Sequence, residues 1–243
     1  MDLVIDVGNT FVKFAVFQED EIVFQTSTEV FNFEKEFKNI LKKYSKIKDC
    51  IISSVGNLNK DDYKLIQKSI HVLVLDSETK LPFQNKYKTP KTLGVDRLAL
   101  VSGAVKLFPQ KNVLVIDAGT CITFDFISKE NTYLGGAISP GIRMRYKSLN
   151  NLTANLPLLE TKLPEHFIGD TTGDAIHSGV VFGVLSEIEG AINQYMHKYS
   201  DLTVILTGGD ANFLSKQLKS SIFANSNFLL QGLNHILQFN KAE

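Results

Sequence analysis

Hydrophobic and polar positions alternate with a period of two near the start of the chain, which is the pattern of β-strands with one buried face. The alternation runs over residues 3–26 and is broken by turn residues at Gly8 and Asp20. It predicts a strand, a tight hairpin turn and two further antiparallel strands. The apolar runs CIISSV and HVLVL predict two more buried strands, and residues 61–69 between them predict a helix. Strand and helix thus alternate, which favours an α/β fold with crossover helices.

Helical spacing of apolar residues marks most of the remaining segments. Helices are predicted over residues 34–47, from about Gly94 to Phe108, up to about Asn151, over 172–199 and over 228–239. The helix at 172–199 is the clearest of them, because its 3–4 spacing persists and Thr171 with Asp174 forms a capping-box-like start. The helix that starts near Gly94 is expected to bury one stripe, made of Leu98, Val101, Val105 and Phe108.

One six-residue pattern occurs twice, each time at the end of a predicted strand. LVIDVG at residues 3–8 matches LVIDAG at residues 114–119 with an offset of 111 residues, and both copies run into an alternating strand. An offset close to half of the chain length indicates two similar halves. We expect the boundary between Leu107 and Asn112, with an N-terminal lobe of residues 1–109 and a C-terminal lobe of residues 110–243.

Composition and charge narrow the possible classes of protein. The 243 residues are 44% hydrophobic, and 26 basic side chains balance 26 acidic ones. Without a basic excess, neither nucleic acid nor an anionic membrane is expected as the main partner. Cys50 and Cys121 lie in apolar runs and are interpreted as buried thiols in a reducing compartment. No leader pattern is visible and no apolar run approaches the roughly 18 residues of a membrane helix, so a cytoplasmic location is expected.

The repeated pattern places an aspartate, Asp6 or Asp117, at a strand end two residues before a glycine. Glycine lets a phosphate approach backbone N–H groups, and the carboxylate can hold a divalent cation. A single copy is better explained as a strand terminator and hairpin turn. Two copies, together with TGGDA at the end of a third strand, favour a nucleotide cleft between two lobes. Thr10 and Lys13 flank the first turn, although Lys13 can also be an outward residue of its strand.

The segment GVDRLAL combines an acid and a base at the start of a helix. Asp96 has an ordinary explanation, because an acidic residue in a first turn interacts favourably with the helix dipole. Asp96 and Arg97, next to a polar loop with Tyr87, can also bind a hydroxylated carboxylic acid, with Arg97 on the carboxylate and Asp96 accepting a proton. No paired zinc ligands, no G-x-x-x-x-G-K-[ST] phosphate loop and no G-x-S-x-G nucleophile elbow occur.

Six ordered motifs resemble those of type III pantothenate kinases. They are DVGNT with Lys13, GVDR, DAGTCITFD, GGAISPG, GDTTGDAIHSG and LTGGDA, and they span residues 2 to about 210. GVDR has valine where alanine is commoner in the family, a change that touches no functional group. The resemblance implies the duplicated, ribonuclease H-like fold of the actin-like ATPase superfamily, with two lobes and a nucleotide cleft between them.

The resemblance also implies an activity. Such an enzyme uses ATP with Mg²⁺ to phosphorylate pantothenate to 4'-phosphopantothenate, the first step of coenzyme A biosynthesis, and requires a monovalent cation, K⁺ or NH₄⁺. Family members are homodimers whose substrate site involves the dimer interface. The N-terminal lobe would carry the ATP phosphate hairpin and the pantothenate loop. The C-terminal lobe would carry a second phosphate loop, the adenosine loop and a dimer helix, for which residues 172–199 are our candidate.

Roles follow by position from the resemblance. The ATP site would comprise Asp6, Val7, Gly8, Asn9, Thr10, Phe11, Val12, Lys13 and Thr120. The pantothenate site would comprise Tyr87, Gly94, Val95, Asp96, Arg97 and Thr172. Asp96 resembles the proton acceptor, Asp117 the ligand of the monovalent cation, and Asp6 lies near the magnesium. Two alternatives stay open: another small-molecule kinase or phosphatase of this superfamily, and a non-catalytic regulator that acts through a protein partner.

Overall fold

The computed structural model describes residues 1–8, 11–54 and 58–241. The chain divides into two compact units, each described separately below. Unit 1 comprises Met1–Pro109, Asn131–Tyr133 and Asn227–Glu243, and unit 2 comprises Gln110–Glu130 and Leu134–Ser226. Unit 1 therefore includes the C-terminal helix, which the two-lobe prediction assigns to the second lobe.

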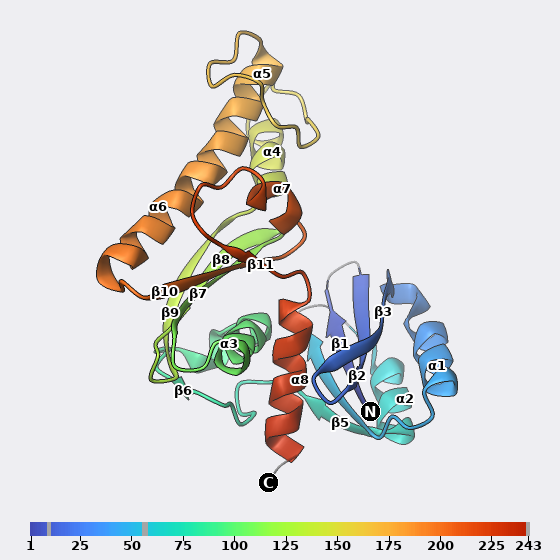
Figure 1. The fold of residues 1–243 in the computed structure, drawn as a ribbon. Helices are drawn as coiled ribbons and strands as arrows, with labels where there is room; N and C mark the ends of the chain where they lie inside the picture. Colours follow the sequence, from blue (N-terminus) through green and yellow to red (C-terminus); the bar gives the residue numbers. More distant parts are fainter. Residues whose placement is uncertain (9–10, 55–57, 242–243) are drawn as a thin grey trace. The chain divides into compact units, whose positions relative to one another are not determined.

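A five-stranded sheet with the order β3-β2-β1-β4-β5 forms the centre of unit 1 (Figure 1). Its strands are β1 (Asp2–Val7), β2 (Phe11–Gln18), β3 (Glu21–Glu29), β4 (Asp49–Ser54) and β5 (His71–Val74). The hairpin partners β1, β2 and β3 are antiparallel, whereas β1, β4 and β5 run parallel. The strands predicted for this part of the chain are confirmed. The two-residue strand β6 (Gln84–Asn85) lies inside a segment predicted as a loop.

Helices cover both faces of this sheet. Helices α1 (Phe33–Lys43) and α2 (Lys60–Ser69) pack on one face, and α3 (Val95–Leu107) and α8 (Phe228–Lys241) lie on the other (Figure 1). Successive residues of β1 therefore enter different cores, Leu3 and Ile5 with α1 and α2, and Val4 with α8. Burial on both faces explains why β1 is almost continuously apolar. Short 3₁₀ turns lie at Val30–Asn32 and Pro90–Thr92.

Helix α3 is buried on all sides over eight consecutive residues, Arg97 to Ala104. The predicted stripe is thus confirmed at Leu98 and Val101, but Val105 and Phe108 are only partly buried and other faces of the helix are buried as well. The reason is α8, whose Gly232 lies so close to α3 that an added Cβ would be 1.9 Å from the Ala99 carbonyl oxygen. Small residues on both helices, including Gly103, allow the two backbones to approach this closely.

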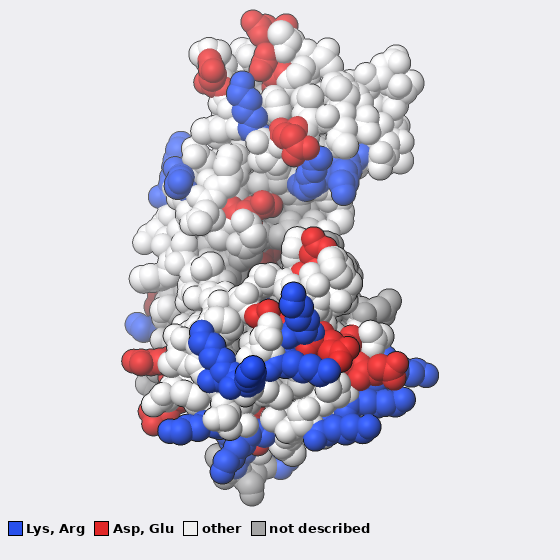
Figure 2. All heavy atoms as spheres, turned by 90° about the vertical axis from the view of Figure 1, so that its right-hand side faces the viewer, with Lys and Arg blue, Asp and Glu red and all other residues white. Residues whose placement is uncertain are grey.

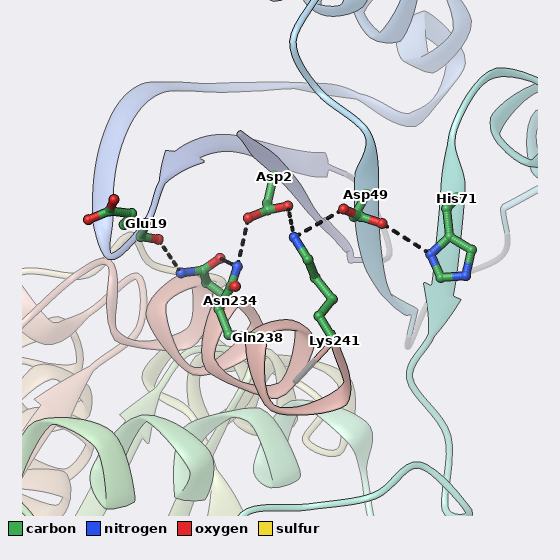
Figure 3. A network of polar contacts seen from close by, with 7 residues as sticks. All are labelled: Asp2, Glu19, Asp49, His71, Asn234, Gln238 and Lys241. Atoms are coloured by element: carbon green, nitrogen blue, oxygen red, sulfur yellow. Dashed lines mark hydrogen bonds and ion pairs between the residues drawn. The ribbon is translucent and has the colours of Figure 1, made fainter. Parts of the chain in front are cut away.

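Polar contacts fix α8 to the N-terminal ends of the interior strands β1 and β4 (Figure 3). The Lys241 Nζ atom lies 2.7 Å from Asp2 Oδ1 and 3.0 Å from Asp49 Oδ2. Gln238 Nε2 donates a 2.6 Å hydrogen bond to Asp2 Oδ2, and His71 Nδ1 lies 3.3 Å from the other Asp49 oxygen. One lysine of the last helix thus bridges carboxylates of two adjacent strands.

Removing this lysine is expected to destabilise unit 1. In Lys241→Met, the buried carboxylate of Asp2 and the partly buried carboxylate of Asp49 lose their shared cation, and the free energy of unfolding should fall by about 2 kcal/mol or more. Urea unfolding at pH 7 measures the loss. Lys64→Met is the matched control, because Lys64 pairs with the exposed Asp61 and its loss should cost less than about 1 kcal/mol. Equal effects of the two variants would contradict a structural role for Lys241.

Unit 2 repeats the strand arrangement of unit 1. Its strands are β7 (Asn112–Ala118), β8 (Cys121–Ile127), β9 (Thr132–Pro140), β10 (Leu202–Thr207) and β11 (Phe223–Ala224), except that the first two residues of β9 belong to unit 1. Strand β7 pairs antiparallel with β8 and parallel with β10, as β1 pairs with β2 and β4. The duplication predicted from the repeated pattern is confirmed at this level.

The helices of unit 2 are α4 (Ile142–Asn151), α5 (Thr172–His177), α6 (Gly183–Lys198) and α7 (Ala211–Ser215). A π-helical turn, Ser178–Phe182, joins α5 to α6, so residues 172–198 form one helical run, as predicted. By length and composition this run is apolar enough to cross a membrane, which corrects the statement that no such run exists. Val180, Val184 and Ile188 on this run lie in the core of unit 2, as in the core helix of a globular protein.

Charges of both signs are interspersed on the face of unit 1 that carries α1 and α2 (Figure 2). Lys38 pairs with Glu34 at 2.5 Å, and Lys64 with Asp61 at 3.5 Å. Opposite charges one turn apart on the same helix neutralise one another, so the lysines of this face do not form a field of one sign.

Candidate active site

Asp6 lies at the end of β1, opposite Lys13 of β2 and Ser53 of β4 in the strand register. Its carboxylate keeps a partial opening to solvent, yet the surrounding protein raises its pKa to about 6. Burial is the main cause, the Asp96 carboxylate adds to it, and Lys13 and the nearby Ser53 hydroxyl of the adjacent strand oppose it. Asp6, Lys13 and Asp96 are therefore electrostatic neighbours in unit 1, as the candidate site requires. The sequence interpretation missed Ser53, whose position opposite Asp6 follows only from the pairing of β1 with β4.

The turn of the first hairpin is closed by a hydrogen bond from Gly8 N to Phe11 O of 2.9 Å. Val7 and Val12 face each other next to this turn and are buried, whereas Phe11 and Lys13 are exposed. The predicted phosphate contacts Asn9 and Thr10 lie outside the described residues. The hairpin thus buries both valines and leaves Lys13 accessible to an anion.

Asp96 occupies the first turn of α3, where Gly94 is the N-cap residue and Val95 the first helical residue. The Asp96 Oδ1 atom accepts a 2.9 Å hydrogen bond from the backbone N–H of Arg97. A Cβ on Gly94 would lie only 2.3 Å from this oxygen. Glycine at position 94 thus provides the space in which the Asp96 carboxylate turns back over the helix start.

Arg97 is a buried cation, with 4% of its surface exposed. Its guanidinium carbon lies 5.6 Å from the centre of the Tyr87 ring, which places the cation over the aromatic face. A planar guanidinium held in this way suits the bidentate recognition of a carboxylate. The structure therefore brings together Tyr87, Gly94, Val95, Asp96 and Arg97 in unit 1.

Three backbone loops converge around Asp117 in unit 2. The β7–β8 turn is closed by a 2.9 Å hydrogen bond from Gly119 N to Cys121 O, one residue tighter than the closure from Gly8 N to Phe11 O, and leaves Thr120 exposed. Gly208 comes directly after β10 and has a φ of 97°. It lies so close to Asp117 that a Cβ on it would be 2.4 Å from Asp117 Oδ1. Gly141 donates to the Thr120 carbonyl oxygen at 3.0 Å. The role of Gly141 was not predicted, although its position after a strand end was a signal for a close backbone approach.

Thr172 is the exposed first residue of α5 in unit 2, whereas the other predicted pantothenate residues belong to unit 1. Thr171 caps this helix by accepting a 3.1 Å hydrogen bond from Asp174 N, so the predicted capping interaction is confirmed. The described part of unit 1 therefore assembles the acceptor group without Thr172.

The donor set fits magnesium bound together with a nucleotide. Among the described residues, no three His, Cys, Asp or Glu side chains are grouped so that they can hold a metal ion. Mg²⁺ prefers one or two carboxylates, water and substrate phosphates to a cage made by the protein alone. Asp6, at the first hairpin of unit 1, supplies such a carboxylate.

Comparisons with known proteins agree with this geometry. A family model described as type III pantothenate kinase matches residues 2–194. A type III pantothenate kinase of Christiangramia forsetii is 52% identical over 243 residues, which cover 100% of both chains. That of Flavobacterium psychrophilum is 50% identical over 241 residues, covering 99% of this chain and 100% of the relative.

Solved structures support the fold. A Campylobacter jejuni protein described as a Baf family transcriptional activator superimposes with a TM-score of 0.64 at 22% identity, covering 99% of this chain and 100% of the other. A glucokinase from an Antarctic psychrotroph gives a TM-score of 0.56 at 12% identity, covering 98% of each chain. The fold is therefore that of the actin-like ATPases and sugar kinases, as predicted.

Proposed function

The chain belongs to the type III pantothenate kinase family, and we propose that Asp96 receives the proton of the hydroxyl that it phosphorylates. The enzyme transfers a phosphoryl group from ATP to pantothenate, forming 4'-phosphopantothenate in the first step of coenzyme A biosynthesis. The observation that carries the proposed roles is the juxtaposition of Asp6, Lys13 and Asp96 in one unit, where Lys13 lowers and Asp96 raises the pKa of the Asp6 carboxyl.

Arg97 and Tyr87 bind the acceptor in this proposal. The Arg97 guanidinium takes the pantothenate carboxylate, and Tyr87 holds the guanidinium on its ring. Asp96, one residue earlier, then orients the terminal hydroxyl and accepts its proton. Gly94 and Val95 shape the entry to this pocket.

Lys13 and the backbone N–H groups of the hairpin turns bind the phosphates of ATP. Thr120 adds a contact from the second hairpin. Asp6 would hold the divalent cation, which would neutralise charge on the phosphate oxygens when it is bound. Asp6 and Asp117 would repel the nucleotide without cations, which explains how a chain of zero net charge binds ATP.

We also assign a binding site for a monovalent cation, K⁺ or NH₄⁺, to Asp117. The Ala118 carbonyl oxygen and Asp117 Oδ1 lie beside the same point of Gly208, 2.3 and 2.4 Å from where a Cβ would be, and oxygen ligands of this kind suit a weakly hydrated cation. A coupled ADP-release assay with pantothenate and a panel of sugars, run separately in K⁺, NH₄⁺ and Na⁺, tests both function and ion. We expect turnover with pantothenate and with none of the sugars, and the rate with pantothenate should be low when Na⁺ is the monovalent ion. Turnover with a sugar instead would refute the substrate, and equal rates in all three ions would refute the role of Asp117.

We further propose that the protein is a homodimer and that residues 172–198 form its interface. Only 44% of the most apolar 18-residue stretch of this helical run is buried within one chain. A helix that is this apolar is usually buried on all sides. A second copy would cover the remaining surface. Light scattering should therefore give twice the 27.1 kDa mass of one chain, and a monomer at micromolar concentration would contradict the assignment.

The location we propose is the cytoplasm, where ATP and free thiols are both available. Cys50 and Cys121 are not disulfide-bonded, and Cys50 is fully buried. Recovery of the native protein in the membrane or periplasmic fraction of its cell would contradict this location.

A further inference from the structure

A column of aromatic rings leads from the Arg97 guanidinium into the interior of unit 1. The guanidinium lies over Tyr87, and the Tyr87 ring stacks on Tyr133 with a centroid distance of 6.1 Å and an angle of 17°. Phe83 meets Tyr133 edge-on, also at 6.1 Å. Tyr133 is fully buried, whereas Tyr87 and Phe83 are partly exposed. We call Phe83, Tyr87 and Tyr133 the aromatic column, and Tyr133 is its central ring.

Backbone hydrogen bonds hold this column in register. Strand β6 pairs with the start of β9, so that Asn85 lies opposite Tyr133. Lys86 N donates a 3.0 Å hydrogen bond to the Tyr133 carbonyl oxygen, and Tyr87 N donates a 2.9 Å hydrogen bond to Asn85 Oδ1. The polar loop that carries Tyr87 is thereby anchored to the segment that carries Tyr133.

The exposure of successive residues along this loop also indicates that its aromatic rings face Tyr133. Phe83 and Tyr87 are partly buried, while Gln84 and Lys86 are exposed. Alternate residues of an extended segment point to the same side, so both rings face Tyr133. The loop thus presents two aromatic side chains to one buried ring.

We infer that Tyr133 is a positioning residue for the acceptor site, because it fixes the Tyr87 ring and thereby the Arg97 guanidinium. Tyr133 has no exposed surface and is not placed to touch the substrate itself. The inference rests on the proposed function, in which Arg97 binds the acceptor carboxylate. It assigns a task to a residue that comes from a different part of the sequence than the GVDR motif.

The expected consequence is specific to acceptor binding. Asp96 is held by its own hydrogen bond from Arg97 N and by the start of α3, and Asp6 is held in the central sheet. Neither depends on the aromatic column. Without the Tyr133 ring, Tyr87 loses its stacking partner and the aromatic face under the guanidinium is less firmly positioned, so the acceptor binds more weakly while the chemical step is preserved.

Steady-state kinetics of Tyr133→Leu and Tyr133→Phe test this inference. In Tyr133→Leu, the KM for pantothenate should rise about 3- to 12-fold, with kcat and the KM for ATP changed less than about twofold. Tyr133→Phe keeps the ring and should resemble the wild type. If both variants raise the KM equally, the hydroxyl group is responsible and the inference is overturned. Phe83→Leu removes the edge contact and should raise the same KM by about twofold or more, which keeps the test valid if Tyr133→Leu does not fold.

Coupling to Tyr87 separates a positioning role from a purely structural one. If Tyr133 acts through Tyr87, the variant that combines Tyr87→Leu with Tyr133→Leu should have the pantothenate KM of Tyr87→Leu alone. Multiplied effects would overturn the inference. The control is Phe126→Leu, which removes a buried ring that stacks on Tyr199 at 4.3 Å in unit 2 and should leave the pantothenate KM unchanged. A wild-type enzyme that does not use pantothenate would instead refute the proposed function, a result seen before any variant is made.

Discussion

Replacing Asp96 with asparagine is expected to lower kcat for pantothenate phosphorylation by about 10²- to 10⁴-fold, the usual contribution of a proton acceptor. Asparagine keeps the shape of the side chain and an oxygen for the Arg97 N–H, but it cannot accept the proton of the hydroxyl. The KM for ATP should stay within about twofold of the wild type, because the phosphate hairpins are intact. Steady-state kinetics with each substrate varied in turn measure these effects.

A matched control distinguishes this role from a helix-dipole effect. Asp61 occupies the second helical position of α2, as Asp96 does in α3, and its side chain is 92% exposed. Asp61→Asn should lower stability by about 0.3–1 kcal/mol and leave kcat unchanged. Asp96 would lose its proposed role if Asp96→Asn kept near-normal turnover, or if it lost no more activity than the Asp61 control.

Asp6→Asn is expected to have opposite effects on stability and activity. In the folded protein without ATP or Mg²⁺, the pKa of Asp6 is raised from 3.8 to about 6, chiefly by burial. The folded state therefore holds this proton more tightly than the unfolded state, and wild-type stability is lost as pH rises from about 4 to above 6. A difference of about two pKa units corresponds to roughly 3 kcal/mol. Asparagine does not titrate, so the variant should be more stable by roughly this amount at pH 8 and show little gain at pH 4.

Urea unfolding at the two pH values, with and without Mg·ATP, measures this trade-off. Mg·ATP should stabilise the wild type and not Asp6→Asn, which should also lose turnover. Asp201→Asn is the control, because the pKa of Asp201 is shifted in the opposite direction: a hydrogen bond from Asn112 lowers it. A variant that is less stable than the wild type at pH 8 would show that Asp6 serves structure and not the binding of cations.

Short motifs predicted the parts of the site that are close together in the sequence. DVGNT placed Asp6 and Lys13 on the two strands of a hairpin, where the register pairs them. GVDR placed Asp96 and Arg97 in the first turn of α3. In both cases local geometry is sufficient, because a hairpin turn and a helix start fix the relative positions of residues only one to seven positions apart.

Contacts between segments that are far apart in the sequence could not be predicted from sequence patterns. Tyr133 and Tyr87 are joined through a two-residue strand, which is too short to produce an alternating pattern. The burial of α3 on all sides depends on α8, which follows the whole of unit 2 along the chain and then packs in unit 1. A single sequence shows that both helices are apolar but not that they pack against each other.

The most direct test of the account is to identify the product of the wild-type enzyme. Purified enzyme is incubated with ATP, Mg²⁺, K⁺ and pantothenate, and the phosphorylated product is located by mass spectrometry and ³¹P NMR, with Asp96→Asn in parallel. The account predicts stoichiometric ADP and a phosphate ester at the terminal hydroxyl of pantothenate, with almost no product from the variant. ADP release that does not depend on pantothenate, or equal product from both enzymes, would contradict it.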